Sequence, residues 1–193
     1  MVVLVTGAAL TVRASYLHAK ARLASVLIER AWKESERTGV AKKPWAWADL
    51  RPVARLKIPR LKFDEYVLDN ASPRTLAFGP GIVGNGVGVG KAGNLVLAGH
   101  RTSWFLPLEQ ILPNDRVELE WFGTGAGELR KRSYRVERIL VVEPSDVSLL
   151  GTSDEDALTL ITCYPFGYGA TSPQRFVIRA VPDTEETSLV NEP

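Results

Sequence analysis

The stretch "DALTLITCYPF" (residues 156–166) contains Cys163, the single cysteine of the chain. Residues 157–163 are mostly apolar or β-branched, which predicts a buried strand. The Tyr-Pro pair at 164–165 ends that strand, because proline has no N–H to donate to a sheet. A thiol buried at the end of a strand is ordinarily inert packing. Cys163 becomes a nucleophile only where a neighbouring base or cation favours the thiolate, so the rest of the sequence decides its role.

Short strands predominate on both sides of this stretch. Several segments alternate apolar and polar residues, as half-buried strands do, and short helical or turn pieces at 72–78, 104–111 and 146–150 separate them. Seven or so short strands with brief connectors predict a mostly β protein folded as a closed or nearly closed barrel. The predicted strands besides 157–163 are 53–59, 63–68, 94–100, 115–121, 133–144 and 175–181.

The region before the strands has a different character. Residues 14–37 predict an amphipathic helix, because apolar side chains recur three or four positions apart. Residues 1–13 are apolar and carry no charge before Arg13, but they are shorter than the roughly 20 residues of a spanning helix. We expect them to be a truncated membrane anchor. The apolar stripe of the helix consists of Leu17, Ala21, Ala24, Ile28 and Ala31.

The chain therefore divides into five parts. The apolar segment 1–13 and the helix 14–37 are followed by a connector with proline and tryptophan at 38–52, a barrel domain at 53–182 and a tail at 183–193. The tail is acidic and has no periodicity, so we expect it to be disordered. At 193 residues the chain has the length of one domain with a sizeable core.

Composition argues against several classes of protein. The 24 Lys+Arg and 22 Asp+Glu give a net charge of +2, which is too balanced for a nucleic-acid binder. One cysteine and two histidines cannot supply the four ligands of a structural zinc site, and we expect no metal and no cofactor. The glycine-rich segment 79–94 lacks the Walker pattern, and "VLVTGAA" (3–9) lacks the further glycines of a dinucleotide-binding turn.

Two residues stand where they can act together with Cys163. His100 ends the predicted strand 94–100 as Cys163 ends its own, so in a barrel both can face one groove. Arg175 opens the next predicted strand, which suits two adjacent antiparallel strands and sets a guanidinium beside the thiol to stabilise an oxyanion. Each residue alone is more often packing or a solvated side chain, but the combination favours acyl transfer. The competing arginines are Arg101, Arg132 and Arg179.

Three segments together resemble the sortases, a family of transpeptidases. "TLITC" (159–163) matches the TLxTC signature of that family, "LVLAGHR" (95–101) resembles its histidine segment and "QRFVIRA" (174–180) resembles its arginine strand. They stand in the family's order, within a match from about residue 50 to 182. The sequence is most similar to class GN sortases of Gram-negative bacteria, and class D, which shares "TCYPF", comes next.

The resemblance implies a fold and a site. The fold would be a closed sortase-type β-barrel of about eight strands with short helices, preceded by an N-terminal α-helix. Cys163 would be the nucleophile, His100 the acid/base and Arg175 the stabiliser of oxyanion and substrate. The enzyme would cleave an LPxTG-like sorting signal through an acyl-thioester and transfer it to an amine. The expected substrate-binding residues are Tyr164, Phe166 and Tyr168 in the turn after Cys163, together with Trp104.

The resemblance also implies partners and a location. The substrate would be a surface protein with a C-terminal sorting signal, and the acceptor an amine whose identity the sequence does not give. The enzyme would lie in the cell envelope, anchored to the inner membrane through its N-terminus and facing the periplasm. Two alternatives remain open: a thiol peptidase or hydrolase that uses the same site with water, and a non-catalytic β-barrel binding module in which Cys163 is packing.

Overall fold

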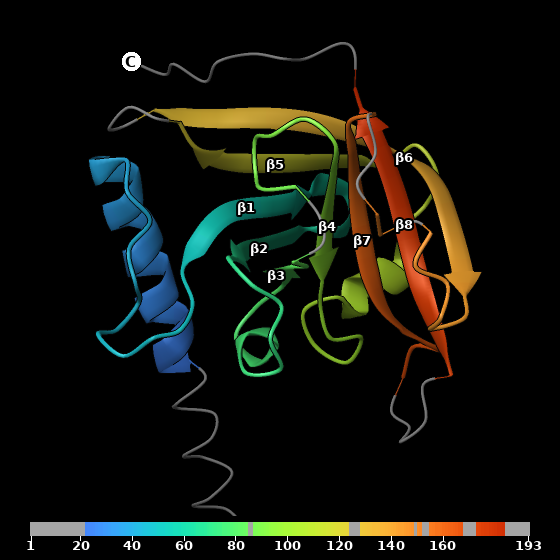
Figure 1. Cartoon of the computed structure of the whole chain (residues 1–193), viewed down its shortest axis with the longest axis horizontal. Helices are drawn as coiled ribbons and strands as arrows, with labels where there is room; N and C mark the ends of the chain where they lie inside the picture. The colour runs from blue at the N-terminus through green and yellow to red at the C-terminus, as the bar shows by residue number, and fades with distance from the viewer. Residues whose placement is uncertain are drawn as a thin grey trace, which may run out of the picture.

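A closed β-barrel forms the body of the protein (Figure 1). The computed structural model describes residues 22–84, 87–123, 128–148, 150–151, 155–167 and 173–183. In these residues eight strands neighbour one another in the order β1-β2-β3-β4-β7-β8-β6-β5. The predicted fold class, a mostly β barrel of about eight strands preceded by a helix, is confirmed. The strands are β1 (Pro52–Ile58), β2 (Phe63–Leu68), β3 (Gly81–Ile82), β4 (Asn94–Ala98), β5 (Arg116–Phe122), β6 (Leu129–Val142), β7 (Ala157–Tyr164) and β8 (Gln174–Pro182).

Alternating side chains build the core of the barrel. Along β1 every second residue is buried, and Leu56 of β1 pairs with the equally buried Leu119 of β5. Burying one such side chain contributes about 1.5–3 kcal/mol of hydrophobic stabilisation. The interior is therefore packed with side chains, and a ligand has to bind at the ends or on the outside of the barrel. Other fully buried members of the core include Ile58, Leu97, Phe105, Leu108, Leu158, Leu160 and Ile178.

Two strand pairings position the candidate site. β4 and β7 are parallel, in a register that runs from Asn94 opposite Ala157 to Ala98 opposite Ile161. β7 and β8 are antiparallel. Figure 1 shows these three strands side by side on one side of the barrel, with β5 and β6 supplying the crossover between β4 and β7. The carboxyl ends of β4 and β7 consequently meet at the same end of the sheet.

The N-terminal helix packs against the outside of the barrel. Residues 22–38 are helical, and Ala24, Ile28 and Ala31 of the predicted apolar stripe are buried. The Trp32 ring lies 4.2 Å from the Phe122 ring and 5.6 Å from the Tyr66 ring, measured between centroids. The predicted stripe residues Leu17 and Ala21 lie outside the described residues, as do the segment 1–13 and the tail from residue 184. Across the described residues we find no helix that combines the length and the apolar character needed to cross a membrane.

The structure corrects several predicted boundaries. The predicted strand 94–100 ends at Ala98, so His100 follows the strand instead of belonging to it. The predicted strand 133–144 is β6, which begins at Leu129. The strand β3 lies inside the glycine-rich segment 79–94, where no strand was predicted. A two-residue strand has no periodicity to detect, and a Cβ at Gly81 would collide with the backbone of Asn70.

Short 3-10 helices occupy two of the predicted helical pieces. η2 (Thr75–Ala77) lies within 72–78, and η3 (Leu106–Gln110) lies within 104–111. A further one, η1 (Pro59–Leu61), follows β1, and its first residue had been included in the predicted strand 53–59. The described residues of 146–150 form turns and not a helix. Five residues give little room for the hydrogen-bond ladder that a helix needs to nucleate.

Candidate active site

Cys163 and Arg175 are partners in the ladder between β7 and β8. Their Cα atoms pair in the antiparallel register, one position before the last pair, Tyr164 with Gln174. Directly opposite residues project their side chains to the same face, with Cβ atoms about 4.5–5.5 Å apart. Both residues are half-buried. The thiol and the guanidinium therefore share one face at the open end of the ladder.

His100 lies at the same end of the sheet. It follows β4 after Gly99, whose N–H donates to the Ile161 carbonyl (3.3 Å) and thereby extends the β4–β7 pairing by one residue. The Thr162 hydroxyl in turn donates to the Gly99 carbonyl (2.7 Å). The segment that carries His100 is thus hydrogen-bonded to the two residues that precede Cys163. The His100 side chain is exposed, so it is accessible to a substrate.

Gly99 permits this arrangement because a larger residue would not fit. A Cβ at this position would lie 2.7 Å from the ring of Phe105, which is fully buried in the core. Real Cβ atoms do not approach so closely, and a buried ring in a packed core has little room to move. Because Gly99 has no side chain, its backbone can pack against the Phe105 ring directly before His100.

The competing arginines have other partners. Arg101 is only 8% exposed and donates from Nη1 to the Pro165 carbonyl (2.6 Å). Arg132 pairs with Asp156 (3.0 Å), which directly precedes β7. Arg179 of β8 lies 3.6 Å from Glu137 and 3.4 Å from Glu155. Arg175 is thus the arginine that the ladder sets opposite Cys163.

Residues adjacent in sequence to Cys163 and Arg175 form a cluster of aromatic side chains. Tyr164 and Phe166, both predicted to bind substrate, pack with Phe176 of β8. The Phe176 ring centroid lies 6.2 Å from that of Tyr164, in a stacked arrangement, and 5.1 Å from that of Phe166, edge to face. This aromatic cluster (Tyr164, Phe166 and Phe176) flanks Cys163 and Arg175 along the chain. The fourth aromatic residue of the prediction, Tyr168, lies outside the described residues.

Trp104 has a different setting. Its indole N–H donates to the Leu76 carbonyl of η2 (3.0 Å), and its ring packs against the core. It also lines a cavity of about 180 Å³ beside Glu65 of β2, in which neither Cys163 nor Arg175 takes part. Burial, and then the neighbouring Asp64, raise the pKa of the Glu65 carboxyl to about 7. Nothing in these contacts brings Trp104 to the thiol, and its substrate role stays a prediction.

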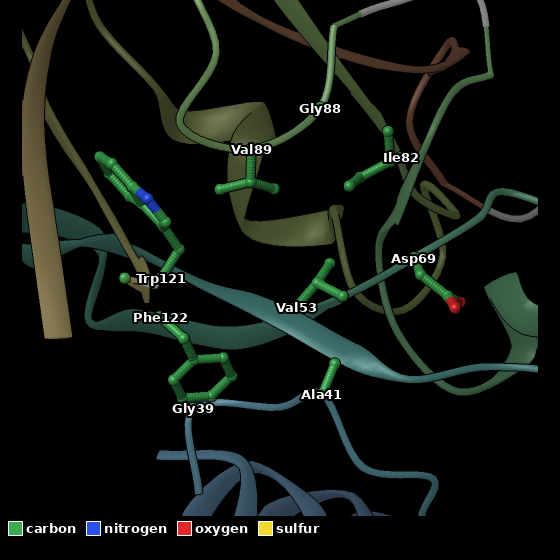
Figure 2. A pocket seen from close by; sticks show the side chains of 10 residues that line it. Gly39, Ala41, Val53, Asp69, Ile82, Gly88, Val89, Trp121 and Phe122 are labelled. Atoms are coloured by element: carbon green, nitrogen blue, oxygen red, sulfur yellow. The ribbon is translucent and has the colours of Figure 1, made fainter. Parts of the chain in front are cut away.

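A second cavity is lined by residues of β1, β3 and β5 and of the loop before β4 (Figure 2). Its volume is about 380 Å³, and Figure 2 shows Trp121, Val89, Ile82 and Val53 around it. The loop that contains Val89 is tied to the start of β4, because the Val87 N–H donates to the Asn94 carbonyl (3.2 Å). Cys163, His100 and Arg175 are not among the residues that line this cavity.

Neither Thr162 nor Arg101 was assigned a role in the site from the sequence. Thr162 is buried, and its hydroxyl donates to the Gly99 carbonyl. Arg101 was regarded only as a competitor of Arg175. The available signal was their position, since each is adjacent in sequence to a predicted catalytic residue. Over the described ranges, no group of three or more His, Cys, Asp or Glu side chains is arranged to hold a metal ion.

The arrangement has the groups that acyl transfer to a thiol requires. A thiol supplies the nucleophile, an imidazole can move a proton, and a guanidinium can stabilise an oxyanion. All three lie at one end of the adjacent elements β4, β7 and β8.

Comparison with known proteins identifies a family and a relative of this chain. A family model described as a sortase domain matches residues 56–183. Sortase D of Bacillus subtilis (strain 168) is 27% identical over 124 residues, a match that covers 64% of this chain and 60% of that protein. The chain thus spans less than two thirds of the length of that relative.

Solved structures show the same similarity. A lid mutant of sortase A from Corynebacterium diphtheriae is 28% identical with a TM-score of 0.61, covering 72% of this chain and 74% of that one. A Clostridium perfringens sortase D5 transpeptidase has a TM-score of 0.67 and covers 84% of this chain and 99% of that one; at 19% identity it supports the fold alone. Since the family model matches well over half of the sequence, this chain belongs to the sortase family.

Proposed function

We propose that this protein is a cysteine transpeptidase that cleaves a sorting signal and joins it to an amine. The observation that carries the proposal is the pairing of Cys163 with Arg175 beside the segment of His100. A cysteine that only filled the core would need neither a facing arginine nor an exposed histidine nearby. Membership of the sortase family supports the same chemistry.

The first half of the reaction forms an acyl-enzyme. The Cys163 thiolate attacks the carbonyl carbon of the scissile peptide bond, and the negative charge that develops on the carbonyl oxygen is stabilised by the Arg175 guanidinium. The carbon–nitrogen bond then breaks while protonated His100 gives its proton to the departing amine. The product is a thioester between Cys163 and the amino-terminal part of the substrate.

The second half transfers the acyl group. An incoming amine attacks the thioester carbonyl, and the neutral imidazole of His100 takes a proton from the attacking nitrogen. A new amide bond forms, the carbon–sulfur bond breaks, and the Cys163 thiolate and the His100 imidazolium are regenerated. Water in place of the amine would give a free acid, so exclusion of water from the groove favours transfer over hydrolysis.

The substrate we propose is a surface protein with a C-terminal, LPxTG-like sorting signal. Apolar residues in such a signal would contact the aromatic cluster, where Tyr164 and Phe166, in the segment that follows Cys163, offer half-buried ring surface. Tyr168 and Trp104 are proposed as further contacts on sequence grounds. The acceptor is an amine.

For location we propose the cell envelope. The N-terminal region would attach the enzyme to the inner membrane, with the barrel facing the periplasm, as in a class GN sortase of a Gram-negative bacterium. The support is the apolar sequence of residues 1–12 and the similarity of the N-terminal and "CYPF" segments to that class. Fractionation of cells that express the full chain, with and without residues 1–13, tests the attachment: the shortened protein should leave the membrane fraction.

Mass spectrometry of the purified protein tests the activity. The protein is incubated with peptides carrying a Leu-Pro-x-Thr-Gly sequence, with and without glycinamide as a primary amine. We expect an acyl adduct on Cys163, absent in Cys163→Ala, and a ligated product that requires the amine. An adduct that yields only free acid would identify a hydrolase. Absence of an adduct across a library of such peptides, together with slow alkylation of the thiol by iodoacetamide, would contradict a catalytic Cys163.

A further inference from the structure

Hydrogen bonds on both sides of His100 join its segment to the segment of Cys163. Gly99 and Arg101 are the immediate neighbours of His100, and each bonds to the cysteine side: Gly99 accepts from the Thr162 hydroxyl (2.7 Å), and Arg101 donates to the Pro165 carbonyl (2.6 Å). Thr162 directly precedes Cys163, and Pro165 follows it by two residues. His100 and Cys163 are therefore enclosed between these two bonds.

The burial of Arg101 shows that its bond is built into the structure. Its side chain is 8% exposed, although a guanidinium strongly prefers water. Removing a cation from water costs several kcal/mol unless its donors are satisfied. A hydrogen bond from a charged donor to a carbonyl is among the stronger ones and fixes direction as well as distance. A surface arginine needed only for solubility would not be placed in this way.

The position of Pro165 extends the effect to the rest of the site. Pro165 lies between Tyr164 and Phe166, and both of these rings pack with Phe176. Phe176 is the neighbour of Arg175 on β8. Holding the Pro165 carbonyl therefore fixes the turn after Cys163 against the strand that carries Arg175.

We propose that Arg101 is a positioning residue, which sets the placement of His100 relative to Cys163 by holding the turn at Pro165. The proposal rests on the proposed function of the Cys163 site. Arg101 itself does not contact the reacting atoms. Displacement of a catalytic group by 1 Å can lower a rate about 10²-fold. The loss of this bond should therefore change kcat more than KM.

Two substitutions of Arg101 test the role. R101M keeps the length and apolar stem of the side chain but removes every donor, and R101K keeps one donor and the charge. We expect R101M to lower kcat about 10²-fold with KM changed by less than about threefold, and R101K to recover part of that loss. Alkylation of Cys163 by iodoacetamide at pH 7, which needs no peptide, should also be slower in R101M than in the wild type.

The matched control is Arg132, a half-buried arginine, which pairs with Asp156 before the start of β7. R132M removes an equivalent polar contact at the other end of that strand and should keep the wild-type kcat. A wild-type kcat in R101M would overturn the proposal. Equal losses of kcat in R101M and R132M, in step with their melting temperatures, would also overturn it. If R101M does not fold, R101K is compared with R132K, with a fall of about tenfold in kcat expected only in R101K.

Failure of the proposed function would be recognised separately. The proposed function predicts an acyl adduct in the wild-type protein. The positioning role of Arg101 is measured instead by the difference between variants in kcat and in alkylation rate. A wild type without any adduct would overturn the transpeptidase. An unchanged alkylation rate and kcat in R101M, with the wild-type adduct present, would overturn only the role of Arg101.

Discussion

Cys163 of β7 and Arg175 of β8 are directly opposite each other in the barrel. Because side chains alternate between the two faces of a strand, a register shift of one residue would turn Arg175 away from the thiol. Arg179, four residues further along β8, is opposite Thr159 instead. The register therefore selects one arginine of β8 as the partner of the cysteine.

Replacement of this arginine by lysine should abolish most of the activity. A lysine keeps the charge but loses the planar fork of donors, and the loss of one oxyanion donor typically costs 10²–10³ in rate. We expect R175K to lower kcat by about that factor in the peptide ligation assay. R179K, on the same strand, is the control and should stay close to the wild type. Equal activity of R175K and the wild type would contradict a role for Arg175 in the transition state.

The Thr162 hydroxyl should matter for activity beyond its effect on stability. Thr162→Val removes its bond to Gly99, and Thr159→Val removes a similar buried bond from Thr159 to the Asn94 side chain (2.7 Å) at the other end of β7. Each should lower the free energy of unfolding by about 1–2 kcal/mol in urea titrations. Only Thr162→Val should also slow peptide ligation at 25 °C. A similar loss of activity in both variants would mean that stability alone is responsible.

Gly99→Ala should disturb the site through the core. The added methyl group meets the ring of Phe105, so either the ring or the chain before His100 has to move. We expect a loss of about 1–3 kcal/mol in unfolding free energy and a fall in ligation rate. The matched control is Gly151→Ala, because a Cβ there has no neighbour within 4 Å. Comparable activity in the two variants would show that Phe105 yields without moving His100.

Glu65→Gln should stabilise the protein at alkaline pH. The pKa of Glu65 is raised to about 7 from its ordinary 4.5, chiefly by burial, so the folded state favours the protonated form. Its contribution to stability is complete below pH 4.5 and is lost as the pH rises through 7. The neutral glutamine avoids this loss.

Melting curves at two pH values test this prediction. We expect Glu65→Gln to raise the melting temperature at pH 8.5, by a gain in stability of about 1 kcal/mol because solvent screens the part-exposed carboxylate. It should have no such effect at pH 4. Glu109→Gln, which removes an exposed carboxylate, is the control. A gain of equal size at both pH values, or in both variants, would contradict the assignment to Glu65.

Local patterns in the sequence were enough for most of the fold. Alternation or an apolar run predicted seven of the eight strands, because each is at least five residues long and buries at least one face. The strand β3 was missed, since two residues cannot show a period. The end of β4 was predicted two residues too late, because Gly99 and His100 continue the pattern of the strand although the ladder ends at Ala98.

The sequence by itself determined the barrel class, the nucleophile candidate and the strand ends where Cys163, His100 and Arg175 stand. These depend on hydrophobic period, on proline and glycine, and on motif order, all of which are local. Only the tertiary structure decided that Thr162 bonds to Gly99 and that the buried Arg101 bonds to Pro165. Both bonds join residues more than sixty positions apart. Such contacts depend on the parallel register of β4 and β7, which no short stretch of sequence specifies.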